Sequence, residues 1–197
     1  QQAVRNAEEA LERRQAEIGT KARLNRELAD FLELPEPPGR IEVYDNSHVQ
    51  GAHALGAMIV AGPEGFVKGQ YRKWNIKSAQ TNDDFAMMRE VFQRRFARAQ
   101  DEDPDRDGGM WPDLVLIDGG KGQMSAARDT LEELGIEDVP LIAIAKGPHH
   151  GREGREVFHF PDGRTWNPLS KDANSRGELP PTVGMVRTYR SIRPTAR

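Results

Sequence analysis

The chain has 197 residues, of which 37% are hydrophobic and 30% charged, and its net charge is −3 at pH 7. This length suits one full-sized domain with an appendage, and the near-neutral charge excludes a strong global basic field, although a local basic surface could still bind DNA. The absence of cysteine excludes disulfides, thiolate metal sites and cysteine nucleophiles.

Membrane insertion and secretion are not indicated by the sequence. No apolar stretch approaches the roughly 20 residues that a membrane helix needs, and no signal peptide is visible. We therefore expect a soluble protein of the cytoplasm. The first residue, Gln1, is not an initiator methionine, which suggests a fragment of a longer protein.

The first 34 residues are rich in Ala, Glu, Arg and Leu and have the pattern of a connecting helix. Apolar residues recur at three-, four- and seven-residue spacings, mostly on one stripe. We expect one long amphipathic helix over residues 1–34, interrupted near Gly19 if anywhere. The segment 35–40 contains three prolines and predicts a stiff linker that ends the helix.

Three strands and a helix are predicted next. The strands cover residues 41–45, 54–62 and 65–77, and the intervening sequence "GPEG" is typical of a hairpin turn. The helix covers residues 82–99, with Asn82 or Asp83 as its cap. We expect the charged sequence "DEDPDRDGG" that follows to be a flexible, solvated loop.

The remaining elements have the strand, turn and helix order of an α/β unit. A continuous apolar run at 114–117 predicts a strand covered on both faces, and a helix over 121–134 ends before Gly135, a good cap. A buried strand at 139–147 and a hairpin that turns at Asp162 and Gly163 complete the pattern. The order β-β-β-α-β-α-β predicts an α/β fold, a mixed sheet with helices packed on it.

Two of the predicted strands end on a carboxylate, Asp45 in "IEVYDNSH" and Asp118 in "LVLIDGGKGQ". A single aspartate at a strand end is usually a turn former or a helix cap. Two such carboxylates side by side would repel each other, and a divalent cation would remove that penalty. Mg²⁺ and Mn²⁺ prefer oxygen ligands, so the pair favours a metal site suited to in-line attack on phosphorus.

The glycines that follow Asp118 could bring a phosphate backbone close to the main chain. Gly119, Gly120 and Gly122 offer no side-chain obstruction, and Lys121 could offset the phosphate charge. The sequence "GGKG" is not a Walker loop, because the first glycine of that pattern is missing and Gly122 replaces the Ser or Thr after the lysine.

Histidines and basic residues add weaker candidates. His48 and His53 lie near Asp45 in sequence, although a lone histidine is more often a hydrogen-bonded structural residue than a ligand. We expect His149, His150 and His159 to be exposed. Basic residues between the two aspartate motifs could line a phosphate track, although each one alone is more often a solvated side chain. They are Arg72, Lys73, Lys77, Arg89, Arg94 and Arg95.

Five segments carry a family resemblance: "IEVYDNSHVQG", "GQYRKWNIK", "DDFAMMREVFQRRF", "WPDLVLIDGGKGQMSAA" and "VPLIAIAKG". Together they resemble the C-terminal half of UvrC proteins, the family of incision subunits in bacterial nucleotide excision repair. The resemblance runs from the leading helix to about residue 163. It implies a ribonuclease-H-like endonuclease domain over residues 41–163, which agrees with the predicted order of strands and helices.

The resemblance also implies a chemistry and partners. It implies metal-dependent hydrolysis of a DNA phosphodiester on the 5′ side of a lesion, with Asp45 and Asp118 as the catalytic, metal-binding residues and Lys121 in support. His48 is a further candidate supporting residue because it lies near Asp45 in the sequence. Damaged double-stranded DNA would be the substrate, and UvrB on that DNA the partner, held through family segments absent from this chain. Mg²⁺ or Mn²⁺ would be the cofactor.

The chain departs from the family pattern after residue 163. Family members carry a catalytic histidine in a "DEAHRFA"-like helix, whereas this chain has no histidine after His159. Residues 164–197 lack helical periodicity, and with residue 163 they contain seven Lys or Arg against two Asp or Glu, which is typical of a poorly ordered basic tail. We hypothesise a frameshifted or otherwise altered C-terminus, or failing that a divergent lineage, and expect impaired activity.

Two other functions fit the same sequence pattern. The chain could be a non-catalytic DNA- or partner-binding module that retains only the fold, and metal affinity would separate this alternative from a nuclease. A resolvase or an RNA:DNA-hybrid nuclease on the same fold is disfavoured by the "DGGKGQ" context, and a cleavage assay would show the substrate choice.

Overall fold

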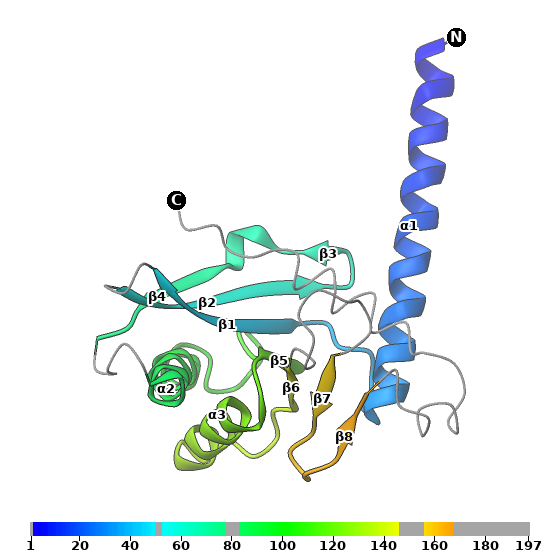
Figure 1. Cartoon of the computed structure of the whole chain (residues 1–197). Helices are drawn as coiled ribbons and strands as arrows, with labels where there is room; N and C mark the ends of the chain where they lie inside the picture. The colour runs from blue at the N-terminus through cyan, green and yellow to red at the C-terminus, as the bar shows by residue number, and fades with distance from the viewer. Residues whose placement is uncertain (1, 50–52, 78–82, 146–155, 168–197) are drawn as a thin grey trace.

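The structure, a computed structural model, describes residues 2–49, 53–77, 83–145 and 156–167. The predicted linker at 35–40 separates a long helix from a sheet with two further helices (Figure 1). The basic tail expected over residues 164–197 lies, apart from its first four residues, outside the described residues. In the described part of the chain no helix is long and apolar enough to cross a membrane.

The first helix, α1 (Gln2–Leu32), is continuous through Gly19, so the interruption considered near that residue does not occur. Its first turns extend away from the sheet (Figure 1), and their apolar residues are exposed, among them Leu11 at 57%. Its last turns pack on the sheet through Leu28, which is 1% exposed. Exposed i,i+4 ion pairs such as Arg23–Glu27 run along the polar side of the helix.

The strands form one mixed sheet in the order β3-β2-β1-β5-β6-β7-β8, with β4 paired to β2. β1, β5 and β6 are parallel to one another, and the remaining pairs are antiparallel. The predicted mixed α/β sheet is therefore confirmed. The strands are β1 (Ile41–Val49), β2 (His53–Gly62), β3 (Gly65–Phe66), β4 (Arg72–Asn75), β5 (Leu114–Asp118), β6 (Leu141–Ala145), β7 (Val157–His159) and β8 (Thr165–Trp166).

The single strand predicted over residues 65–77 is wrong, because two short strands and a 3₁₀ turn (η1, Lys68–Gln70) occupy it. Phe66 pairs with Ala61, and Arg72 pairs with Met58. Five residues, 67–71, therefore lie between the two pairs on this segment, opposite only two residues, 59 and 60, of β2. The excess residues cannot join the ladder and leave it as the 3₁₀ turn. A two-residue side-chain alternation read through this segment therefore fails at the turn.

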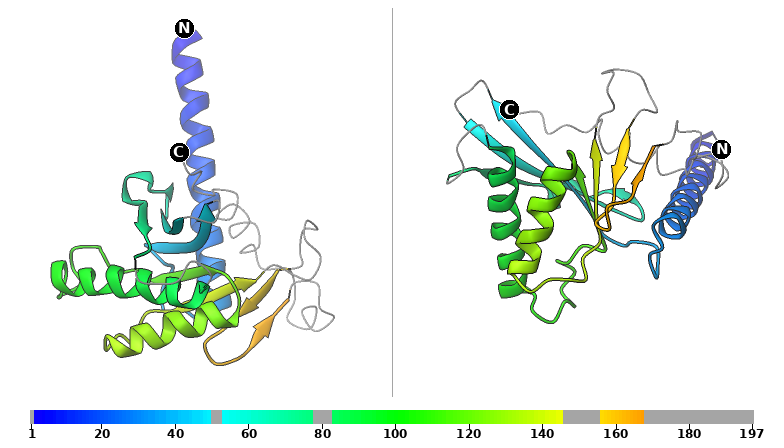
Figure 2. Two further views of the ribbon diagram at one scale, coloured as in Figure 1. Left: turned by 60° about the vertical axis from the view of Figure 1, so that its left-hand side comes forward. Right: turned by 60° about the horizontal axis from the view of Figure 1, so that its bottom comes forward.

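Helices α2 (Asp84–Glu102) and α3 (Lys121–Glu133) lie side by side on one face of the sheet (Figure 2). Asp83 caps α2, and its Oδ1 accepts hydrogen bonds from the backbone N–H of Phe85 at 3.1 Å and Ala86 at 2.8 Å. Gly135 follows α3 with a φ of +72°, as expected of the residue that ends a helix in the left-handed region.

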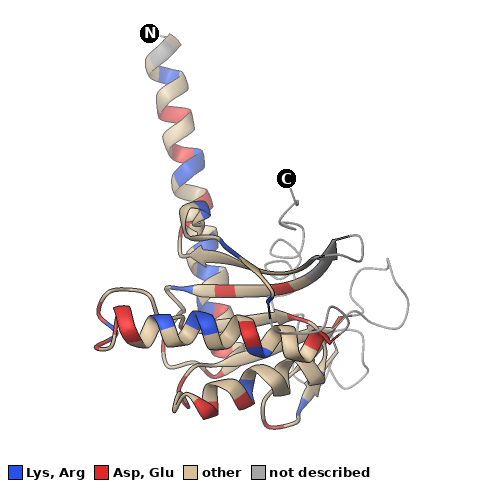
Figure 3. Ribbon diagram, turned by 90° about the vertical axis from the view of Figure 1, so that its left-hand side faces the viewer, with Lys and Arg blue, Asp and Glu red and all other residues tan. Residues whose placement is uncertain are grey.

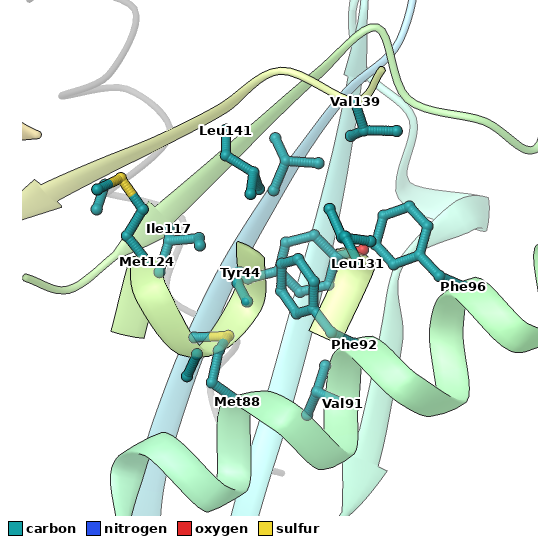
Figure 4. Close-up of a cluster of buried hydrophobic side chains, with 14 of the residues drawn as sticks. Tyr44, Met88, Val91, Phe92, Phe96, Ile117, Met124, Leu131, Val139 and Leu141 are labelled. Atoms are coloured by element: carbon teal, nitrogen blue, oxygen red, sulfur yellow. The ribbon is translucent and has the colours of Figure 1, made fainter. Parts of the chain in front are cut away.

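The two faces of the sheet bury two separate hydrophobic cores. On the α2 and α3 face, Tyr44 and Ile117 pack with Phe92 and Met88 (Figure 4). On the opposite face, the core joins the sheet to the end of α1 and to the aromatic residues of β7 and β8. Members of this second core include Leu28, Ile41, Ile59, Leu114, Leu116, Ile142, Ile144 and Phe158.

A buried carboxylate on β1 joins the strand to α2. Glu42 is fully buried, and its Oε1 accepts a hydrogen bond from Arg95 at 2.6 Å and another from Arg40 at 2.8 Å. Tyr44 donates its hydroxyl to the same carboxylate, and burial followed by the charge of Glu42 raises the pKa of Tyr44 well above its ordinary value. The expectation that Arg95 lines a phosphate track is wrong, because its guanidinium is committed to this ion pair.

The charged loop expected to be flexible and solvated after α2 is organised around one carboxylate. Asp103 is 4% exposed and accepts hydrogen bonds from the backbone N–H of Gly108 at 2.9 Å and Met110 at 3.0 Å. The hydrogen bond from Met110, followed by that from Gly108, lowers the pKa of Asp103. The guanidinium of Arg106 lies 4.0 Å from the Trp111 ring centroid and closes the loop.

We predict that Glu42→Gln lowers the free energy of unfolding by on the order of 3 kcal/mol, because it leaves Arg95 charged and buried without a counter-charge. Urea unfolding of the wild type and the variant measures the difference. Glu102→Gln is the matched control, since it breaks the exposed Arg98–Glu102 pair at the end of α2 and exposed pairs contribute little. Equal unfolding midpoints for Glu42→Gln and the control would contradict the role given to the buried pair.

Candidate functional site

Asp45 and Asp118 occupy neighbouring positions on the adjacent parallel strands β1 and β5. The last residue pair of this ladder is Tyr44 with Ile117, and each aspartate directly follows its member of that pair. Side chains alternate between faces along a strand. Since Tyr44 and Ile117 enter the core beneath α2 and α3, both carboxylates leave the sheet on the opposite face.

The two carboxylates lie where the second core ends. Neighbouring strands are about 4.8 Å apart, and both aspartates are half-buried. Asp118 also pairs with Ile144 of β6, which belongs to the second core. The arrangement therefore concentrates negative charge at one border of an apolar surface.

This donor set fits a hard divalent cation. Mg²⁺ is held in many proteins by one or two carboxylates, with water and substrate phosphate as its other ligands. Within the described residues, no group of three or more His, Asp or Glu side chains is placed to hold a metal. The two aspartates thus offer two of the ligands of such an ion, and water and substrate would supply the others.

The turn after β5 is tight because Gln123 folds back over it. The Gln123 Oε1 accepts a hydrogen bond from the backbone N–H of Gly120 at 2.9 Å. A Cβ on Gly119 would lie 3.0 Å from the Gln123 side chain, closer than ordinary contact. Gln123 therefore leaves little space beside the turn, and α3 starts immediately afterwards at Lys121, whose side chain is exposed.

Gly122 has a packing role that the sequence did not suggest. A Cβ at this position would lie 2.3 Å from the Phe85 ring. The glycine therefore lets the first turn of α2 approach the first turn of α3. The sequence indicated this close helix–helix contact only by placing a glycine inside a predicted helix, where glycine often serves to allow close packing.

The candidate basic residues do not share one surface. Arg72 donates to the carbonyls of Gly69 at 3.2 Å and Tyr71 at 2.8 Å, and Arg94 is bound to Glu90 and to the Asn75 carbonyl. Lys77 is exposed, and its backbone N–H donates to the carboxylate of Glu90. Helix α2, which carries exposed Arg89, bears both basic and acidic residues along its length (Figure 3).

The histidine positions are only partly described. The backbone of His48 lies in β1 and that of His53 in β2, whereas their side chains, like residues 149 and 150, lie outside the described part. His159 is half-buried rather than exposed, and its Nδ1 is buried without a hydrogen-bond partner. Burial first, and then the nearby charge of Lys121, lower the pKa of His159.

Comparison with known proteins extends the sequence resemblance. The family model described as "UvrC RNAse H endonuclease domain" matches residues 29–179, beyond the limit near residue 163 expected from the sequence motifs. The human Endonuclease V catalytic domain matches in structure with a TM-score of 0.46 and 15% identity, covering 83% of this chain and 78% of that one.

Two curated relatives are both named UvrABC system protein C. The protein of Novosphingobium aromaticivorans is 81% identical over 164 residues, 83% of this chain and 25% of that protein. That of Zymomonas mobilis is 49% identical over 197 residues, 99% of this chain and 28% of that protein. The chain thus spans about a quarter of the length of these relatives, and it belongs to the UvrC family through its RNase H endonuclease domain.

Proposed function

We propose that this chain is the metal-dependent endonuclease domain that makes the 5′ incision in bacterial nucleotide excision repair. The observation that carries the proposal is the placement of Asp45 and Asp118 at neighbouring positions on one face of β1 and β5. The substrate is damaged double-stranded DNA in the cytoplasm. UvrB on that DNA is the partner, reached through segments of the family's proteins that lie outside this chain.

Asp45 and Asp118 are the proposed catalytic residues and would hold Mg²⁺ or Mn²⁺. When bound, the ion supplies Lewis-acid activation of water and stabilises charge on the phosphate. By holding the ion, the two carboxylates would fix the position of the scissile phosphate relative to the sheet. His48, three residues after Asp45 on β1, is proposed to support the site.

The turn from Gly119 to Gly122 is proposed to receive the DNA backbone. Gly119 and Gly120 add no side chains at the carboxyl end of β5, and their own N–H groups are donated to the Ile144 carbonyl and to Gln123 Oε1. The donors offered to phosphate would therefore be the N–H groups of the first turn of α3. Lys121 adds a mobile positive charge at the same point. Gly122 contributes to this approach only through the start of α3, since its own α-carbon packs against Phe85.

The basic residues proposed to contact phosphates beyond the site are Arg72, Lys73, Lys77 and Arg89. All four side chains are exposed. Each phosphate contact would release counterions and make binding weaker at high salt. Because the net charge of the chain is only −3, such local contacts, and not a global field, would attract DNA.

The chain is proposed to cleave more slowly than family members that carry the histidine motif. Residues 164–197 contain no histidine. A positioned acid–base group contributes roughly 10²–10⁴-fold in rate, so its loss would reduce the rate by that order. The alternative function is a non-catalytic DNA- or partner-binding module, which would keep the fold without needing a cation.

We predict slow but detectable 5′ incision of a lesion-containing duplex by this chain when the other components of the repair reaction are supplied with Mg²⁺. Asp45→Asn and Asp118→Asn should each abolish the nick, because one carboxylate cannot hold the ion in place. Asp105→Asn, which changes an exposed loop carboxylate, is the control. Incision as fast as that of a relative with the histidine motif would contradict the proposed impairment.

We also predict that Mn²⁺ binds to the chain in the absence of DNA, as measured by isothermal titration calorimetry. Asp45→Asn should weaken this binding at least tenfold, because an oxygen ligand loses its charge, whereas Asp105→Asn should leave it unchanged. Equal Mn²⁺ affinity of the wild type and Asp45→Asn would favour the non-catalytic alternative.

A further inference from the structure

A single cross-strand row connects a lysine to the two aspartates. Asp45 pairs with Ala57 of β2, and Ala57 pairs with Lys73 of β4. On the other side of Asp45 comes Asp118, which pairs with Ile144 of β6. The row therefore reads, from β4 to β6, lysine, alanine, aspartate, aspartate and isoleucine.

The members of this row share one face of the sheet. Residues paired across an antiparallel ladder point to the same side. Arg72, the neighbour of Lys73, pairs with Met58, a member of the core under α2. Lys73 must therefore point to the opposite side, which is the face of Asp45 and Asp118.

The two ends of the row differ in chemistry and in access. At the β6 end, Ile144 and its partner Phe158 are 3% and 2% exposed, and Trp166 packs edge-on against Phe158 with ring centroids 5.1 Å apart. At the β4 end, Lys73 is exposed. Only a methyl group, that of Ala57, stands in the row between Lys73 and Asp45, and a lysine carries its charge on a flexible four-carbon stem.

A DNA strand bound at the two aspartates would thus adjoin buried apolar side chains on the β6 side and the exposed Lys73 on the β4 side. Burying phosphate against Ile144 and Phe158 would cost desolvation energy, and no described residue at that end of the row supplies a counter-charge. Passing over Ala57 brings the phosphate to an ammonium group. Among the four proposed phosphate contacts, Lys73 is the one that β4 places in the aspartate row.

We propose that Lys73 binds the phosphate adjoining the scissile phosphate, so that the cleaved strand leaves Asp45 over Ala57 toward β4. This inference rests on the proposed nuclease function and adds to it the direction of the strand across the sheet. It gives Lys73 a role inside the site that its neighbour Arg72, which points to the face of the sheet beneath α2, does not share.

The test combines a protein variant with neutral phosphates. Lesion duplexes carry one methylphosphonate immediately 5′ or immediately 3′ of the scissile phosphate, and incision is measured for the wild type, Lys73→Gln and Lys73→Arg. Losing one charged hydrogen bond should raise KM on the order of tenfold. At one of the two positions, the methylphosphonate should raise the KM of the wild type by this factor. At that position it should leave the KM of Lys73→Gln unchanged, because the variant has already lost the contact.

Lys68→Gln is the matched control, because Lys68 is an exposed lysine in η1, near β4 but outside the row. It should lose little with any duplex, and Lys73→Arg should restore most of the wild-type KM. The inference would be overturned if, at both positions, the increase in KM caused by Lys73→Gln and the increase caused by the methylphosphonate multiply, because the two changes would then act independently. So would a Lys73→Gln variant that behaves like Lys68→Gln on the unmodified duplex.

Failure of the proposed function would be visible separately. If the wild type gives no incision that depends on Asp45, the nuclease proposal fails. The role of Lys73 is then tested by binding alone. Fluorescence anisotropy gives the affinity of the wild type and of Lys73→Gln for the duplexes with and without the methylphosphonate, and the same comparison applies.

Discussion

The proposed site depends on the parallel pairing of β1 with β5. Tyr44 lies opposite Ile117, and this register determines that Asp45 and Asp118 are neighbours on one face. A slip of one residue would send one strand's side chains to the wrong faces, because side chains alternate with a period of two. It would expose Tyr44 and separate the two carboxylates, so the same register that fills the core also builds the site.

Both faces of the sheet oppose such a slip. On one face Tyr44 packs among the aromatic residues of α2, with its ring centroid 4.8 Å from that of Phe92, while Glu42 is bound to Arg95 of the same helix. On the other face Ile41 belongs to the core that anchors α1. A buried ion pair contributes uncertain net stability but favours one arrangement over others, because any alternative leaves a charge unpaired.

The sequence predicted those features that depend on neighbours along the chain. Periodicity located α1 and α2, the apolar run located β5, and Asp83 and Gly135 marked helix ends. The features that it missed depend on partners distant in sequence. Glu42 accepts a hydrogen bond from Arg95, which lies fifty-three residues later in α2. The turn at η1 forms because the segment between Phe66 and Arg72 has more residues than β2 can pair with. Neither relation has a local signature, since tertiary pairing decides both.

Diffraction from a crystal soaked in Mn²⁺ tests the proposed metal site directly, because anomalous scattering locates the ion without reference to activity. We predict a peak between the carboxylates of Asp45 and Asp118, on the face of the sheet opposite α2 and α3. A peak elsewhere, or two carboxylates directed away from each other with no ion between them, would contradict the proposed site.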